Sequence, residues 1–216
     1  LSDEYTIERI IITGGKTIPD YTFTGIYSIK EIILKGDTIT EIGDYSFYGC
    51  ENLTNIEISD SVTTMGEYAF FNTGFSELPS GKNLRNIGNY AFSECKNLVN
   101  ITIPSSVTTI GENVFMNCDG LTSIPRGENL HEIGDGQYCG CDGLVDVTIP
   151  DNITSIGRCA FADCSNLSYL MFTSDAPEIQ SNAFQNTSID VYYPSYCNNW
   201  ENVITNNYGG TIKWKP

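Results

Sequence analysis

The stretch IGNYAFSECKNLVNITIPSSVTT, residues 87–109, decides the fold of this chain, because near-copies of it recur before and after it. Most copies begin with an apolar residue followed by Gly, and successive first residues stand 22 to 24 positions apart. The first residues are Ile18, Ile42, Met65, Ile87, Ile110, Ile133, Ile156 and Ile179. Repeats of this length and regularity indicate a solenoid, in which each coil buries its apolar face only against neighbouring coils.

Two further patterns predict the structure of one coil. An aromatic residue stands five positions after each first residue, and these are Phe23, Phe47, Phe70, Phe92, Phe115, Tyr138, Phe161 and Phe184. After the Cys position apolar and polar residues alternate, as around Ile101 and Ile103, which is typical of a strand with one buried face. We therefore predict a stack of about eight coils whose strands align as a parallel sheet.

The run between Gly and Cys, such as GENVFMNC at 111–118, suits about two helical turns, so the expected class is α/β with short helices or turns. Acidic residues such as Asp44 and Glu112 often begin the run, where a carboxylate would meet the positive end of a helix dipole. A turn follows each run, and its Asn or Gly favours positive φ. These turn residues are Asn52, Asn97, Gly120, Gly143 and Asn166.

Five of the eight cysteines occupy one repeat position, and they are Cys50, Cys95, Cys118, Cys141 and Cys164. Thr73, Thr187 and Ile26 fill the same position in other coils, which favours a buried ladder of small residues over a stack of disulfides or a metal site. The other cysteines, Cys139, Cys159 and Cys197, lie outside this ladder, and any disulfide among them is left open by the sequence.

The uninterrupted repeat predicts one domain with three parts. Residues 1–17 contain the apolar run IERIIIT, which predicts a capping strand for the open end of the stack. Residues 18–193 form the solenoid, in which the coils with Pro79 and Pro125 should have shorter strands because Pro cannot donate to a ladder. Residues 194–216 predict a C-terminal cap made of a short helix at 195–204 and an edge strand at 211–214.

Composition excludes some classes of function. The chain has 11 basic and 27 acidic residues, and the resulting net charge of −16 disfavours nucleic acid and anionic membrane surfaces as partners. No apolar run is long enough to cross a membrane, so membrane insertion is not expected. The first residues, LSDEYTIERI, are not a signal peptide, and they suggest an excised fragment or a processed chain.

The units IGDYSFYGCENLTNIEI, IGNYAFSECKNLVNITIP and IGRCAFADCSNLSYLMF closely resemble the leucine-rich repeats of the BspA type. The ending YYPSYCNNWENV also resembles the close of that family. The resemblance implies a right-handed solenoid, an extracellular or cell-surface location, and adhesion to host proteins or other cells, with no catalytic residues to carry over. The chain departs from the motif at GDGQYCGC, where Gly136 and Gln137 should make the helix the least well formed.

Side chains that could carry catalysis are scarce. His131 stands where other coils have Arg85, Thr63 or Thr108, which indicates a polar surface position more than a catalytic or metal-binding one. No second pair of ligands accompanies Cys139 and Cys141 at a zinc spacing, and no loop of alternating oxygen ligands predicts calcium binding. We therefore expect no enzyme activity, no cofactor and no metal.

The polar positions between the buried strand residues are the remaining candidates, because aligned over the coils they would form a concave surface of the kind with which solenoids bind. The candidate partner-binding residues are Asn55, Glu57, Glu77, Asn100, Thr102, Asp146, Thr148, Tyr169, Met171 and Tyr192. The last three would form an apolar patch that favours partner contact, although an ordinary sheet surface is an equal alternative. We expect a monomeric recognition or adhesion protein that binds a host or neighbouring-cell protein or glycan; the alternative is a structural spacer or stalk of a longer surface protein.

Overall fold

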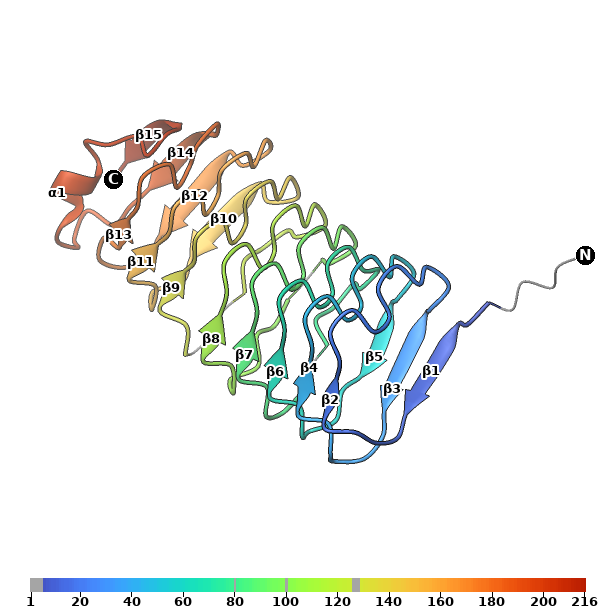
Figure 1. Cartoon of the computed structure of the whole chain (residues 1–216). Coiled ribbons are helices and arrows are strands. Elements are labelled where there is room, and N and C mark those ends of the chain that lie inside the picture. Colours follow the sequence, from blue (N-terminus) through green and yellow to red (C-terminus); the bar gives the residue numbers. More distant parts are fainter. Residues whose placement is uncertain (1–5, 80, 100, 126–128) are drawn as a thin grey trace, which may run out of the picture.

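The computed structural model describes residues 6–79, 81–99, 101–125 and 129–216. The chain winds into an elongated stack of about nine coils with parallel strands, and its two termini lie at opposite ends of the stack (Figure 1). All paired strands are parallel and come from neighbouring coils. The predicted solenoid is thereby confirmed, while its handedness and the capping role of its ends stay predictions.

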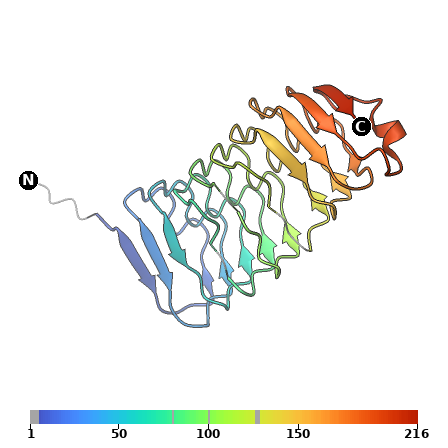
Figure 2. The ribbon, with the colours of Figure 1, turned by 180° about the vertical axis from the view of Figure 1, so that it is seen from behind.

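The strands form two rows on different sides of the stack (Figures 1 and 2). The row with the longer strands, here called the strand face, is the one that the alternating pattern predicts. It contains β1 (Arg9–Ile12), β3 (Glu31–Leu34) and β5 (Asn55–Glu57) in one sheet, and β10 (Asp146–Ile149), β12 (Tyr169–Phe172), β14 (Ser188–Tyr192) and β15 (Thr211–Lys215) in another.

The second row, here called the short-strand row, was not predicted. Its two-residue strands end at the first residue of each repeat, so the Ile that marks the repeat is also a strand residue. They are β2 (Thr17–Ile18), β4 (Glu41–Ile42), β6 (Thr64–Met65), β7 (Asn86–Ile87) and β8 (Thr109–Ile110) in one sheet, and β9 (Glu132–Ile133), β11 (Ser155–Ile156) and β13 (Glu178–Ile179) in another.

Turns, not helices, connect the short-strand row to the Cys position. The third and seventh residues after each first residue have positive φ, which an α-helix does not allow. The third residues are Tyr21, Tyr45, Tyr68, Tyr90, Asn113, Gly136, Cys159 and Asn182, and the seventh are Gly25, Gly49, Asn72, Glu94, Asn117, Gly140, Asp163 and Asn186. Backbone N–H groups here donate to the next coil, as from Phe47 to Ala69 O at 2.9 Å. The expected two helical turns are therefore wrong, and the only described α-helix is α1 (Trp200–Val203).

Two smaller expectations about these turns are also wrong. The carboxylate of Asp44 does not meet a helix dipole, because its Oδ1 accepts a hydrogen bond at 2.7 Å from the N–H of Glu67 in the next coil. The Asn and Gly after the Cys position do not have positive φ. Asn52 instead donates from Nδ2 to the carbonyl of Tyr27, and a Cβ on Gly143 would lie 2.3 Å from the carbonyl oxygen of Asp119 in the preceding coil.

One continuous apolar core runs through the stack, and its centre is the predicted column of aromatic rings. Phe47, Phe70 and Phe92 stack with centroids 5.3 and 5.4 Å apart. The five cysteines of the ladder are fully buried beside this column, and all eight cysteines are free thiols. Each ladder thiol donates to the carbonyl of the aromatic residue in the preceding coil, as Cys164 Sγ does to Tyr138 O at 3.0 Å. The buried-ladder prediction is confirmed.

The buried thiols predict loss of stability at alkaline pH. Burial raises the pKa of Cys164 to about 12 and that of Cys95 to about 11, from an ordinary value of 9.0. Above pH 9 the unfolded chain loses these protons first, so the free energy of unfolding falls as pH rises toward 11–12, by up to ~1.4 kcal/mol per pH unit for each thiol. Urea unfolding at pH 8, 9.5 and 10.5 measures this slope.

The matched variant for that slope is Cys164→Thr, because Thr already fills this position at Thr73 and Thr187. In this variant the free energy of unfolding should fall less steeply above pH 9, by the contribution of one thiol. An unchanged slope in the variant would contradict the assignment to the ladder.

The C-terminal residues pack around two tryptophans. Trp200 is buried against Phe172, with ring centroids 4.8 Å apart, and lies 6.1 Å from Trp214 of β15. The helix is shorter than the predicted 195–204, since it begins at Trp200 after Asn199 with φ of 72°. Tyr196, which precedes the helix, is 83% exposed.

Candidate recognition surface

The strand register brings the predicted surface residues into two rows that cross the coils. Asp146 and Tyr169 are neighbours in one row, and Tyr169 is followed by Asp190. Thr148 pairs with Met171 in the other row, and Met171 with Tyr192. At the other end of the stack, Asn55 and Glu57 of β5 pair with Glu31 and Ile33, so the same two rows begin there. The register aligns the predicted positions within each of these two sheets, whereas Glu77 and Thr102 are in no described strand and Asn100 lies outside the described residues.

The strand face is interrupted in its middle, between β5 and β10. Pro79 and Pro125 interrupt the ladder as predicted, because Pro has no N–H to donate. The coil between them was expected to have a longer strand, yet Ile101–Ile103 is not in a strand. Its neighbours on both sides are the two Pro coils, which have fewer N–H donors for the ladder; among the described residues the N–H of Val99 still donates to Ser76 O at 3.2 Å.

Two hollows lie at this interruption and are lined by predicted residues. Asn55, Glu57 and Glu77 line one of about 380 Å³. Glu77 and Thr102 line a second of about 620 Å³, together with Lys82 from the next loop. Glu57, Glu77 and Thr102 are exposed. The interruption thus places carboxylates, an amide and a hydroxyl around shallow recesses of ligand size.

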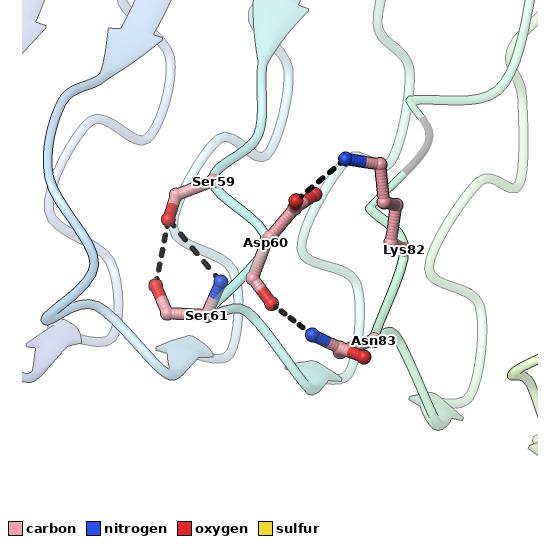
Figure 3. A network of polar contacts seen from close by, with 5 residues as sticks. All are labelled: Ser59, Asp60, Ser61, Lys82 and Asn83. Atoms are coloured by element: carbon pink, nitrogen blue, oxygen red, sulfur yellow. Dashed lines mark hydrogen bonds and ion pairs between the residues drawn. The ribbon is translucent and has the colours of Figure 1, made fainter.

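The loops beside the larger hollow are held by a polar network (Figure 3). Lys82 Nζ lies 2.8 Å from the carboxylate of Asp60 in the preceding coil, and Asn83 donates from Nδ2 to the backbone carbonyl of Asp60, also at 2.8 Å. The hydrogen bond from Lys82 holds the pKa of Asp60 below its ordinary value. Ser59 and Ser61 share a hydroxyl contact of 2.7 Å at the same turn. These contacts fix Lys82, the one described base at the hollow, against its neighbouring coil.

The C-terminal end of the strand face has aromatic side chains, as the sequence predicts. The rings of Tyr169 and Tyr192 are 4.8 Å apart, and the Tyr169 hydroxyl lies 3.5 Å from Met171 Sδ. All three side chains are half-buried, so the patch is less exposed than expected.

Sequence analysis missed the charged residue that joins this patch. Lys215 of β15 places Nζ 2.7 Å from the carboxylate of Asp190, 3.3 Å from the Tyr192 hydroxyl and 5.2 Å from the centre of the Tyr192 ring. Its hydrogen bond holds the pKa of Asp190 below its ordinary value, and the same contact raises the pKa of Lys215. The patch therefore combines aromatic rings with an ion pair instead of being purely apolar.

Comparison with known families decides what kind of repeat this is. The model of the BspA type leucine rich repeat region matches residues 16–145 and 131–203, with six copies. These matches extend over most of the 216 residues. The chain belongs to the BspA-type leucine-rich-repeat family. A search of curated protein sequences found no match to it.

Solved structures of leucine-rich repeat proteins are similar to this chain. The leucine rich repeat protein of T. pallidum is 27% identical, over 70% of this chain and 71% of its own, with a TM-score of 0.62. A leucine-rich repeat protein from Bacteroides ovatus is 22% identical over 90% of this chain and 69% of its own, with a TM-score of 0.55. The second likeness concerns the fold alone.

Two structural searches concern metal binding and membrane spans. Among the described residues no three His, Cys, Asp or Glu side chains are placed to hold a metal ion. No described helix is long and apolar enough to cross a membrane. His131 is exposed, as predicted, and its Nδ1 lies 3.2 Å from the backbone carbonyl of Asn152.

Proposed function

We propose that this BspA-type repeat protein is a non-enzymatic recognition protein of the cell surface or extracellular space, which binds a protein or glycan partner with its strand face. One observation carries the proposal. Tyr169, Met171 and Tyr192 contact one another on adjacent strands, and Lys215 joins them with a charge. Rigid aromatic side chains beside an anchored charge are the groups that contribute most at interfaces.

The shape of the surface supports this proposal. The aromatic patch and the two hollows lie on the same row of strands, so one extended partner would contact both. Asn55, Glu57, Glu77, Thr102, Asp146 and Thr148 would supply polar contacts around the patch. The family resemblance adds the expectation of a surface location, and the acidic composition favours a partner that is not a nucleic acid.

Replacing Tyr169 and Tyr192 together by Ala tests the proposal. Binding to the partner found in a screen of extracellular matrix proteins and glycan arrays should weaken by about tenfold to a hundredfold, because two half-buried rings leave the contact. Surface plasmon resonance measures the dissociation constant. Tyr196→Ala is the matched control, since Tyr196 is 83% exposed and lies outside the strand face. Equal affinity in the double variant would remove the patch from the binding surface.

A rigid spacer in a longer surface protein is the second candidate. The single core from Ile18 to Trp200 favours it, because a continuously packed solenoid keeps its two ends at a fixed separation. A spacer would bind nothing in the same screen. Spin labels attached near its two ends would still be separated by one fixed distance, which pulsed electron–electron double resonance measures.

A further inference from the structure

A column of stacked tyrosines runs along the turns of the first four repeats, where the chain passes from the short-strand row to the strand face. This tyrosine column consists of Tyr21, Tyr45, Tyr68 and Tyr90. Neighbouring rings have centroids 4.6 to 4.9 Å apart, and their planes lie within 12° of parallel. Tyr48 and Phe71 stack 4.7 Å apart beside the column, and the Tyr48 ring lies 5.7 Å from that of Tyr45. The two stacks therefore form one aromatic surface on the turns.

The backbone conformation of these turns does not require tyrosine. All four tyrosines of the column have positive φ, between 53° and 59°. This conformation costs free energy when the side chain is bulky. Three later repeats have Asn113, Gly136 and Asn182 at the same position, and these residue types adopt positive φ more easily. The remaining repeat has Cys159 there. The tyrosines thus occupy a position that favours other residue types.

The phenolic hydroxyls of the column are not used by the described part of the fold. None of the four makes a hydrogen bond with a described residue, whereas the Tyr208 hydroxyl donates to Val203 O at 3.4 Å. They are also not among the buried polar atoms without a partner, so they are open to solvent. Stacking does not need them, because Phe71 stacks on Tyr48 as closely as the tyrosines stack on one another. The column therefore presents a row of unpaired hydroxyls along the stack.

Carboxylates accompany the column. Asp20, Asp44 and Glu67 each directly precede one of its tyrosines, and none of the three is in an ion pair among the described residues. Hydrogen bonds across the coils hold these carboxylates in place, as that from the N–H of Asp44 to Asp20 Oδ1 at 2.9 Å does. Desolvation, the neighbouring ring of Tyr21 and the charges of Glu67 and Asp44 raise the pKa of Tyr45. The fixed negative charges beside the hydroxyls favour a basic partner.

The step of the column matches one peptide conformation. One turn of a polyproline II helix is three residues at about 3.1 Å each, or about 9.3 Å, which is twice the ring step of 4.6 to 4.9 Å. Every third residue of such a segment therefore meets every second tyrosine in the same way. Residues on one face of a β-strand recur at about 6.6 to 6.8 Å, which matches neither one step nor two. The polyproline II backbone has no internal hydrogen bonds, so its carbonyls are free to accept from the hydroxyls.

The stacking also favours a peptide over a sugar. The C–H groups of a sugar ring pack on an open aromatic face, where the π-electron density lies. Both faces of Tyr45 and of Tyr68 are covered by neighbouring rings of the column. The exposed parts of the column are therefore ring edges and hydroxyls, which suit the carbonyls and proline rings of an extended peptide.

We propose that the tyrosine column binds a proline-rich protein segment in the polyproline II conformation, with a basic residue at every third position. The segment lies along the stack, and its backbone carbonyls accept hydrogen bonds from the tyrosine hydroxyls, as in other aromatic surfaces that recognise this conformation. Its Lys or Arg side chains lie beside the carboxylates of Asp20 and Glu67, which are two coils apart. This surface lies on the turns and not on the strand face, so it is independent of the proposed function.

Synthetic peptides and isothermal titration calorimetry test the proposal. A peptide of three Pro-Pro-Arg units should bind at least about tenfold more tightly than one of three Gly-Ser-Arg units, which has the same charge but no preformed conformation. It should exceed a Pro-Pro-Glu peptide by at least as much, and its affinity should fall with added salt. Equal binding of the two Arg peptides, or no binding of the first, would overturn the proposal. Binding of a cello-oligosaccharide at the column in place of the peptide would overturn it as well.

Two variants separate binding from the structural role of the column. Replacing all four of its tyrosines by Phe keeps the stack, as Phe71 shows, but removes the hydroxyls, so the Pro-Pro-Arg peptide should bind about tenfold more weakly while urea unfolding stays nearly unchanged. Glu67→Gln keeps an acceptor for the amide of Asn89 but removes a charge, and should weaken the peptide several-fold at low salt. Tyr196→Phe removes an exposed hydroxyl outside the column and should leave the affinity unchanged. Unaltered affinity in either of the first two variants would contradict the site.

Discussion

Replacing Phe115 by Ala lowers the free energy of unfolding by ~3–5 kcal/mol, the range for large buried aromatic side chains. Phe115 is fully buried in the aromatic column, with ring centroids 6.2 Å from Phe92 and 5.9 Å from Tyr138. Truncation removes both stacking contacts and leaves a cavity bordered by two rigid neighbouring coils, which cannot collapse without breaking their own ladders. Urea unfolding followed by circular dichroism measures the loss.

Thr102→Ala is the control for this prediction, because Thr102 is exposed and lies in the next coil toward the N-terminus. Its effect should stay within about 0.5 kcal/mol, as for ordinary surface substitutions. Equal losses in the two variants would contradict the division of the repeat into buried and exposed positions.

The buried positions were predictable because stacking imposes the same requirement on every coil. Ile87, Phe92 and Cys95 stand at positions whose counterparts are buried or partly buried in every coil, so the sequence shows each requirement eight times. The alignment of Met171 with Tyr192 follows from the same register. For a residue at a repeated position, the sequence thus predicts both its burial and the residues next to it in the adjacent coils.

Features that do not repeat, or that depend on backbone conformation, were harder to predict from the sequence. Most positive φ positions hold Gly, Asn or Asp, but Tyr45, Glu94 and Cys159 also occupy them, so the usual preference for Gly and Asn did not single these positions out. Lys215 lies beyond the last repeat, and only the pairing of β15 with β14 shows that it reaches Asp190. Gln137 is visible as an unusual residue, but only the structure shows that its Oε1 accepts a hydrogen bond from the N–H of Gly134 at 2.7 Å.

In most repeats a glycine follows the first residue, and the structure explains why glycine is needed there. Gly88 does not have positive φ, so conformational freedom does not explain it. A Cβ on Gly88 would lie 2.6 Å from the carbonyl carbon of Gly66 and 2.7 Å from the backbone nitrogen of Glu67. Both atoms belong to the backbone of the preceding coil, so no side chain can move aside.

Gly88→Ala should therefore cost about 3 kcal/mol or more, at the upper end of the range for overpacking, because relief requires two coils to separate. Separation would also weaken the ladder bond from Gly88 N to Met65 O, which is 2.8 Å long. Gly14→Ala is the matched control, since nothing lies within 4 Å of a Cβ there and its φ is not positive. Thermal and urea unfolding of both variants measure the difference. A Gly88→Ala protein as stable as Gly14→Ala would mean that the coils can move apart without loss, and that close stacking is not what requires glycine at this position.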